Sequence, residues 1–253
     1  MSEEWEFYFT SVNDKLASIL VDVGINNRVP DDDRCWLLRV WIYFESTGET
    51  GLPDEEESEK FAPIEEALTE AVQSSLDAVL AGRITTDGRR EFFFYAPSFA
   101  GFEETVTRCM ADYPSYEWEV SSEGDGDWNL YSGLLYPGPG DWQQIQNRQL
   151  LELLVQNGDT LEKKRTVSHW AYLPNESSRD QFVSAIREKG FDVTEQTLED
   201  DPGLENHYGV AFERIDHVDW ESINQVTLEL FELAASLSGN YDGWETTVEK
   251  SPD

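Results

Sequence analysis

Histidines, cysteines and clustered carboxylates are the residues of this sequence that could do chemistry, and their spacing decides which chemistry. The three histidines are His169, His207 and His217. No pair has the HxH or HxxxH spacing that places two imidazoles on one face of a strand or helix, so we predict no metal site. His169 alternates with Val167 and Ala171, and we expect it to be a hydrogen-bonded core or boundary residue rather than a catalytic one.

The two cysteines, Cys35 and Cys109, show no CxxC spacing. This argues against a zinc site, a redox motif or a disulfide framework, and it favours a reducing compartment. Cys109 lies on the apolar face of an expected helix, and Cys35 opens an apolar strand. We therefore expect two inert thiols rather than nucleophiles.

Acidic runs suggest cation binding only weakly. Residues 125–129 (DGDWN) begin like a calcium loop, but Leu130 and Tyr136 stand where an EF-hand requires Gly and Glu, so a hairpin turn is the better interpretation. Residues 31–33 and 55–57 are interpreted as solvated acidic loops. We predict no metal and no cofactor.

Catalytic signatures are also missing from the sequence. It contains no GxSxG, P-loop, dinucleotide fingerprint or HExxH. An enzyme remains as an alternative only through carboxylates that the fold brings together, for example a small hydrolase with paired acids. A deep pocket with two convergent carboxylates would favour that hypothesis, whereas open sheets with a shallow acidic groove would favour a binding protein.

The charge restricts the partners. Asp and Glu number 52 and Lys and Arg 18 in 253 residues, so the net charge is −34. Such a field opposes direct binding of nucleic acid or anionic membranes and favours basic partners. A solvated acidic surface is equally typical of adaptation to a saline cytoplasm, and an acidic inhibitor of the immunity or nucleic-acid-mimicking kind is a further alternative. The aromatic content of 13% predicts a packed core. With no apolar run long enough to span a membrane and no signal-like N-terminus, we expect a cytoplasmic protein.

Hydrophobic periodicity divides the chain into elements. In the first half it predicts helices over 61–75 and 98–110, the second capped by Ser98, and strands over 4–9, 15–23, 35–45, 78–86, 90–95, 116–121 and 128–136. In the second half it predicts helices after caps at Asp141, at Asn175 or Ser177, and at Asp219. The strands expected there span 165–173, 191–198, 207–215 and 243–248, and the cations of residues 163–165 are expected to keep a sheet edge soluble.

Two domains follow from this pattern. Residues 137–141 (PGPGD) interrupt regular structure, so we expect a domain at 1–136, a linker at 137–141 and a second domain at 142–253. Residues 90–136 and 166–215 share an order of elements and form a weak internal repeat. We predict an α+β fold with two ferredoxin-like domains, each an antiparallel sheet with helices packed on one face.

A family resemblance rests on short matches in the second half. They are the helix exit at 157–159 (NGD), the strand 166–169 (TVSH), the segment 190–194 (GFDVT) and above all Tyr241-Asp242-Gly243-Trp244. Residues 148–250 thereby resemble the regulator of ribonuclease E activity B. Residues 1–136, chiefly through the strand 92–95 (FFFY) and its following helix, resemble a bacterial domain of unknown function often found ahead of it.

The resemblance implies a non-enzymatic regulator that binds the scaffold region of ribonuclease E. A basic protein segment would then be the partner, docked on acidic surface. The candidate partner-binding residues are Tyr241, Asp242, Gly243, Trp244, Glu245 and His169. In one interpretation Tyr241 and Trp244 form an aromatic anchor flanked by the acids. In the other, Asp242 and Gly243 turn the chain out of a helix while Trp244 fills the core.

Overall fold

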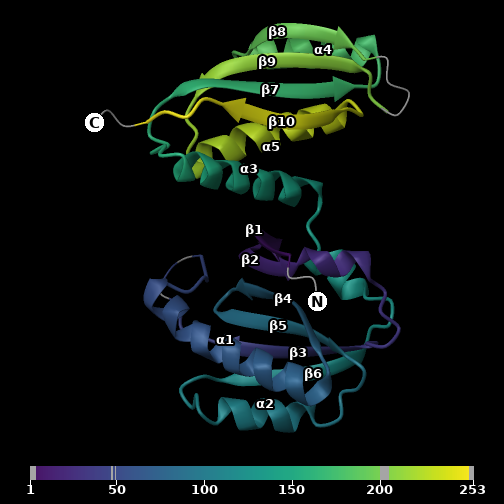
Figure 1. Ribbon diagram of the computed structural model, residues 1–253, viewed down its shortest axis with the longest axis vertical. Coiled ribbons are helices and arrows are strands. Elements are labelled where there is room, and N and C mark those ends of the chain that lie inside the picture. The colour runs from purple at the N-terminus through teal and green to yellow at the C-terminus, as the bar shows by residue number, and fades with distance from the viewer. Residues whose placement is uncertain (1–3, 47, 49, 200–204, 251–253) are drawn as a thin grey trace. The chain divides into compact units, whose positions relative to one another are not determined.

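The chain forms two compact units, Met1–Asp141 and Trp142–Asp253, called here the N-terminal and C-terminal units. The computed structural model describes residues 4–46, 48, 50–199 and 205–250 (Figure 1). Within these residues the N-terminal unit holds a six-stranded sheet and the C-terminal unit a four-stranded sheet. All strand pairs in both sheets are antiparallel.

The N-terminal unit begins with a hairpin that extends its sheet. The strand order is β1-β2-β4-β5-β3-β6, and helices α1 and α2 pack on the same face. In chain order the elements are β1 (Trp5–Val12), β2 (Lys15–Asp22), β3 (Trp36–Tyr43), α1 (Glu55–Leu76), β4 (Val79–Thr86), β5 (Arg89–Ala96), α2 (Phe102–Met110) and β6 (Trp118–Gly124). A 3₁₀ turn at Val23–Asn27 and a π-helical turn at Tyr131–Leu135 complete it.

The C-terminal unit has the strand order β10-β7-β9-β8. Its elements are α3 (Pro139–Gln156), whose first turn contains the division between the units, β7 (Arg165–Leu173), α4 (Glu176–Glu188), β8 (Asp192–Leu198), β9 (Tyr208–Asp216), α5 (Trp220–Ser236) and β10 (Asn240–Thr246). Helices α4 and α5 bury residues such as Phe182 and Leu230 against the inward residues of β7, β9 and β10. The opposite face of this sheet carries no helix among the described residues.

Both units contain the same connectivity. The segment from β3 to β6 and the segment from β7 to β10 each run β-α-β-β-α-β, and in each the first and third strands lie at the centre of the four. The prediction of two α+β units with antiparallel sheets and helices packed on one face is therefore confirmed. The internal repeat was misaligned, because β3 and not β5 is the counterpart of β7.

Residues 128–136 are the clearest error in the predicted elements, because they form a turn and a π-helical segment instead of a strand. Trp128 and Tyr131 cover the face of the N-terminal sheet opposite α1 and α2. The Trp128 ring stacks on Tyr95 with centroids 3.6 Å apart, and Tyr131 Oη donates to the carbonyl of Asp22 at 2.9 Å. The aromatic residues of this segment therefore reflect burial against the sheet, not membership of it.

Helix starts were predicted with mixed success. Asn175 and Asp219 cap α4 and α5, each accepting from a backbone N–H in the first turn. Ser98 does not cap α2, because the helix begins at Phe102. Phe99 was expected to face the core, but it is 47% exposed, and its ring contacts the Trp36 ring.

The expected linker is partly helical. Asp141 lies within the first turn of α3 instead of capping it, since the helix already begins at Pro139. Proline is tolerated there because the first helical N–H groups have no intrahelical partner. Within the described ranges, no helix combines the length and apolar character that crossing a bilayer requires.

Candidate functional site

The Tyr241–Glu245 segment lies on the edge strand β10 and does not turn the chain out of α5. A β-bulge interrupts its pairing with β7: Tyr241 pairs with Ala171, Gly243 with Trp170, and Asp242 is the extra residue. Residues three apart on a regular strand face opposite sides, but one extra residue restores the same side. Tyr241 and Trp244 therefore both face the helices, while Asp242 and Glu245 are both exposed.

Tyr241 is buried beside His169. Tyr241 Oη and His169 Nδ1 are 2.8 Å apart, and the imidazole stacks on Phe212. Burial lowers the pKa of His169 to about 3, with a contribution from the charge of Arg214. Burial and the charge of Asp242 raise the pKa of Tyr241 well above its usual value. The pair is a neutral core hydrogen bond, in agreement with the sequence-based expectation for His169.

Trp244 is tied to the helices by a polar network. Its Nε1 donates to Asn147 Oδ1 of α3 at 2.8 Å, and Asn147 Nδ2 donates to Thr227 Oγ1 of α5 at 2.6 Å. Gln143 Nε2 donates to the same Asn147 oxygen at 3.0 Å. Asn147 was not predicted as a site residue from the sequence. The feature that could have identified it is the four-residue spacing of Gln143, Asn147 and Leu151, which places two amides on the same helix face as a buried leucine.

These positions correct the aromatic-anchor interpretation. Tyr241 is 4% exposed, Trp244 8% and His169 0%, so the three side chains are inaccessible to a partner. They hold β10 against the helices. Gly243 takes φ = 124° in the bulge, a conformation that residues with a Cβ rarely adopt. Of the six candidate residues, Asp242 and Glu245 remain available for contact.

The helix-free face of the C-terminal sheet, called here the open face, carries both of these acids. Cross-strand pairing shows which residues share it, because paired residues point to the same side. They are Asn240, Asp242, Gly243 and Glu245 of β10, Thr166, Ser168, Trp170 and Tyr172 of β7, Gly209, Ala211, Glu213 and Ile215 of β9, and Asp192, Glu195 and Thr197 of β8. Five are carboxylates, and none of these described residues is Lys or Arg.

Two aromatic residues lie at the centre of the open face. Trp170 pairs with Ala211 on one side and Gly243 on the other, and Tyr172 pairs with Gly209 and Asn240. The Tyr172 ring leans over Gly209, since a Cβ added to that glycine would lie 3.2 Å from Tyr172 Cε1. These two rings were not predicted as site residues from the sequence. The feature that could have identified them is two large aromatic residues at the outward-facing positions of a strand whose inward-facing positions are already mostly apolar.

A hollow lies at the Tyr172 end of the open face. Its lining includes Tyr172, Glu199, Glu205, Asn240 and Asp242. Burial raises the pKa of Tyr172, and the carboxylates of Asp242 and Glu199 raise it further. The phenol ring therefore lies in a locally negative environment, with no Lys or Arg among the described lining residues.

The acidic segment that begins at Asp125 has a structural role. Asp125 accepts from Tyr95 Oη at 2.7 Å and from the backbone N–H groups of Asn129 and Leu130, so it caps the turn after β6. Burial raises the pKa of Asp125, but these hydrogen bonds outweigh it and leave the value below its usual range. In the described residues, no group of three or more His, Cys, Asp and Glu side chains is placed to hold a metal.

The cations at 163–165 do not all lie on the surface as expected. Arg165 is buried and forms an ion pair with Asp159, and it also donates to the carbonyl of Thr247 at 2.9 Å. The Arg165 hydrogen bonds hold the pKa of Asp159 well below its usual range. Asp159 also accepts from the backbone N–H of Glu249 at 2.7 Å, so this pair fastens the segment that follows β10. Lys163 and Lys164 are exposed.

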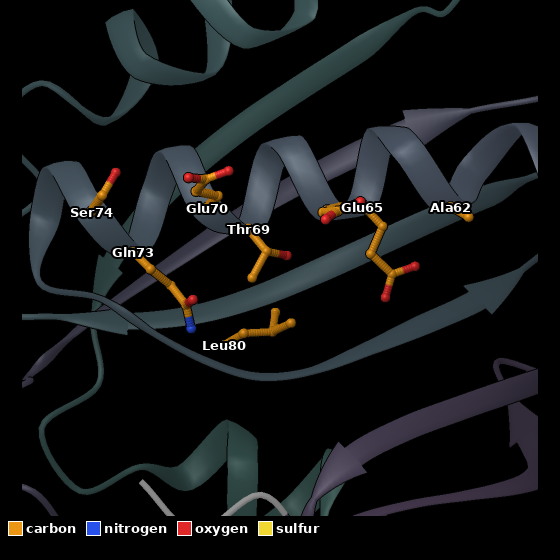
Figure 2. A pocket seen from close by; sticks show the side chains of 8 residues that line it. Ala62, Glu65, Thr69, Glu70, Gln73, Ser74 and Leu80 are labelled. Atoms are coloured by element: carbon orange, nitrogen blue, oxygen red, sulfur yellow. The ribbon is translucent and has the colours of Figure 1, made fainter.

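A second hollow, on the N-terminal unit, bears on the hydrolase alternative. It runs along α1, where Thr69 and Gln73 reach toward Leu80 of β4 (Figure 2). Its carboxylates are Glu65, Glu66 and Glu70. Glu65 already pairs with Arg83 at 2.9 Å and with Arg90 at 3.3 Å, and the other two are exposed. The hollow does not contain the enclosed pair of convergent acids that this hypothesis requires.

Comparison with known proteins follows the division into units. Residues 3–136 match the model of a family of unknown function, DUF695, and residues 144–246 match that of the regulator of ribonuclease activity B. The search of solved structures finds the crystal structure of an unknown protein from Galdieria sulphuraria, at 10% identity over 85% of this chain and 99% of that chain, with a TM-score of 0.22. The search of curated proteins finds no match.

Proposed function

This chain belongs to the family of unknown function DUF695 through residues 3–136, and with residues 144–246 matching regulators of ribonuclease activity, we propose that it is a non-enzymatic regulator that binds a basic protein segment. The segment belongs to the RNA-binding scaffold region of a ribonuclease E-like enzyme, and the encounter takes place in the cytoplasm. The connectivity of both units supports their assignment as ferredoxin-like domains.

The observation that carries this proposal is the open face. Five carboxylates surround two aromatic rings there, and no described residue of that face is a cation. Residues 142–253 hold 22 acidic and 9 basic residues, so the long-range field around the unit has the same sign as the face. Arginine-rich segments that bind RNA present cations spaced for phosphates, and a carboxylate surface competes for those cations. Regulation then follows from occupying the segment, without chemistry.

The test is a titration of the full chain with an arginine-rich peptide at low and high salt. We expect saturable binding at about 50 mM NaCl and roughly tenfold weaker binding at about 500 mM, because salt screens exposed charges. A Glu195→Lys/Glu245→Lys variant should bind at least tenfold more weakly than the unaltered chain at low salt.

The matched control is Glu66→Lys/Glu70→Lys on α1. It changes the net charge by the same amount, but both residues lie on the N-terminal unit and are exposed. It should retain most of the binding. No saturable binding at low salt, or equal loss in both variants, would show that the open face is not the binding surface.

A further inference from the structure

The setting of Trp170 and Tyr172 identifies which cation the open face is built to receive. Trp170 has Ala211 and Gly243 as its cross-strand neighbours, so neither neighbour has a side chain large enough to cover the indole. Carboxylates lie on the same face two residues further along β9 and β10, at Glu213 and Glu245. The indole is therefore partly exposed on the open face, with carboxylates beside its small neighbours.

Tyr172, two residues along β7, has one small cross-strand neighbour, Gly209, and one amide neighbour, Asn240. Gly209 lies beneath its ring, and the hollow beside it is lined by Asp242 and Glu199. Trp170 and Tyr172 point to the same side, and two residues of a strand span about 6.8 Å. The open face thus presents two aromatic platforms at the spacing of alternate residues in an extended chain.

Guanidinium groups suit such platforms better than ammonium groups. Arginine is planar and weakly hydrated, and it stacks on an aromatic ring while its N–H groups donate to carboxylates at the edge. Lysine is a strongly hydrated point charge, so it loses more hydration free energy than arginine when it leaves water. The same unit already contains this geometry elsewhere, where Cζ of the partly exposed Arg214 lies 4.0 Å from the centre of the Phe191 ring.

We propose that Trp170 and Tyr172 are stacking positions for two arginines at alternate residues, Arg-x-Arg, of an extended partner segment that lies along β7 on the open face. This rests on the proposed function and specifies its partner. The carboxylates at Glu213, Glu245, Asp242 and Glu199 border the two rings and receive the outer N–H groups. Charge complementarity supplies most of the attraction, and the rings supply the preference for arginine and for its spacing.

The experiment compares three peptides of equal length and charge on the full chain by calorimetry at low salt. One has arginine at every second position, one has lysine at those positions, and one has the arginines grouped in adjacent pairs. We expect the first to bind roughly tenfold more tightly than the second, since two exposed cation–π contacts are involved. It should also bind several-fold more tightly than the third.

The variant Trp170→Leu/Tyr172→Leu should bind the arginine and lysine peptides equally, while salt-dependent binding to both persists. Trp220→Leu on α5 is the matched control, because it removes a partly exposed indole outside the open face, and it should retain the preference. The comparison of the three peptides on the unaltered chain does not depend on the folding of any variant.

The outcomes separate the two proposals. Equal binding of the arginine and lysine peptides to the unaltered chain, equal binding of the alternate and grouped arginines, or a preference that survives in the folded double variant would each overturn the stacking positions while leaving the proposed function intact. Absence of binding by all three peptides would overturn both.

Discussion

His169 is a buried imidazole with one partnered nitrogen. Its Nδ1 meets Tyr241 Oη at 2.8 Å, and its Nε2 has no partner among the described residues. Removing one member of such a pair leaves a buried polar group unpaired, whereas removing both is nearly neutral. The pair therefore specifies how β7 and β10 pack more than it stabilises the unit.

We predict that His169→Phe destabilises the C-terminal unit by about 1–3 kcal/mol, whereas His169→Phe/Tyr241→Phe lies closer to the unaltered protein. The measurement is chemical denaturation at neutral pH. A double variant that is as unstable as His169→Phe alone, or less stable, would contradict the assignment.

The same residue predicts a pH dependence. Burial lowers the pKa of His169 to about 3, whereas the unfolded chain has the ordinary value near 6.5. Between these values the unfolded state binds the extra proton, so the free energy of unfolding falls as the pH falls. From pH 7 to pH 5 the unaltered protein should lose about 2 kcal/mol more than the double variant. Parallel pH profiles for the two proteins would be inconsistent with a neutral, buried His169.

At the scale of the element, the bulge in β10 decides what the edge strand presents. Without the extra residue, Tyr241 and Trp244 would face opposite sides of the sheet, and one ring would leave the core. The bulge keeps both rings inside and both acids outside. Gly243 makes this register accessible through its positive φ of 124°.

We expect Gly243→Ala to cost about 1–3 kcal/mol of stability, because an alanine there must adopt strained backbone. The cost is conformational, since an added Cβ at Gly243 would meet nothing within 4 Å. Gly124→Ala at the end of β6 is the matched control: it has equal space, its φ is not positive, and we expect little change. Thermal unfolding of both variants is the measurement, and similar losses would refute backbone strain as the cause.

At the scale of the whole molecule, each unit has a hydrophobic core of its own. The N-terminal core gathers α1 and α2 on the sheet through residues such as Phe61, Leu68 and Phe94, and the C-terminal core gathers α4 and α5 through Phe182, Phe212 and Leu230. Chains with separate cores of this size fold as separate domains.

We therefore predict that fragments 1–136 and 137–253 each fold cooperatively when expressed alone. The cut leaves α3 whole in the second fragment and keeps the hydrogen bond from Tyr8 Oη to the carbonyl of Leu135 in the first. Circular dichroism during heating measures this. A fragment without a sigmoidal transition would show that the predicted domain boundary is misplaced.

The sequence by itself determined the α+β class, most strand and helix positions and the place of His169 in the inward phase of its strand, because these depend on local periodicity and residue type. It also determined the sign of the field around the chain, because net charge depends on composition alone. Only the tertiary structure decided that residues 128–136 cover a sheet instead of joining it, that Arg165 pairs with Asp159, and that Trp170 and Tyr172 share a helix-free acidic face. These depend on contacts between distant segments and, for β10, on a one-residue bulge, which reverses the side a residue faces without changing the composition of the strand.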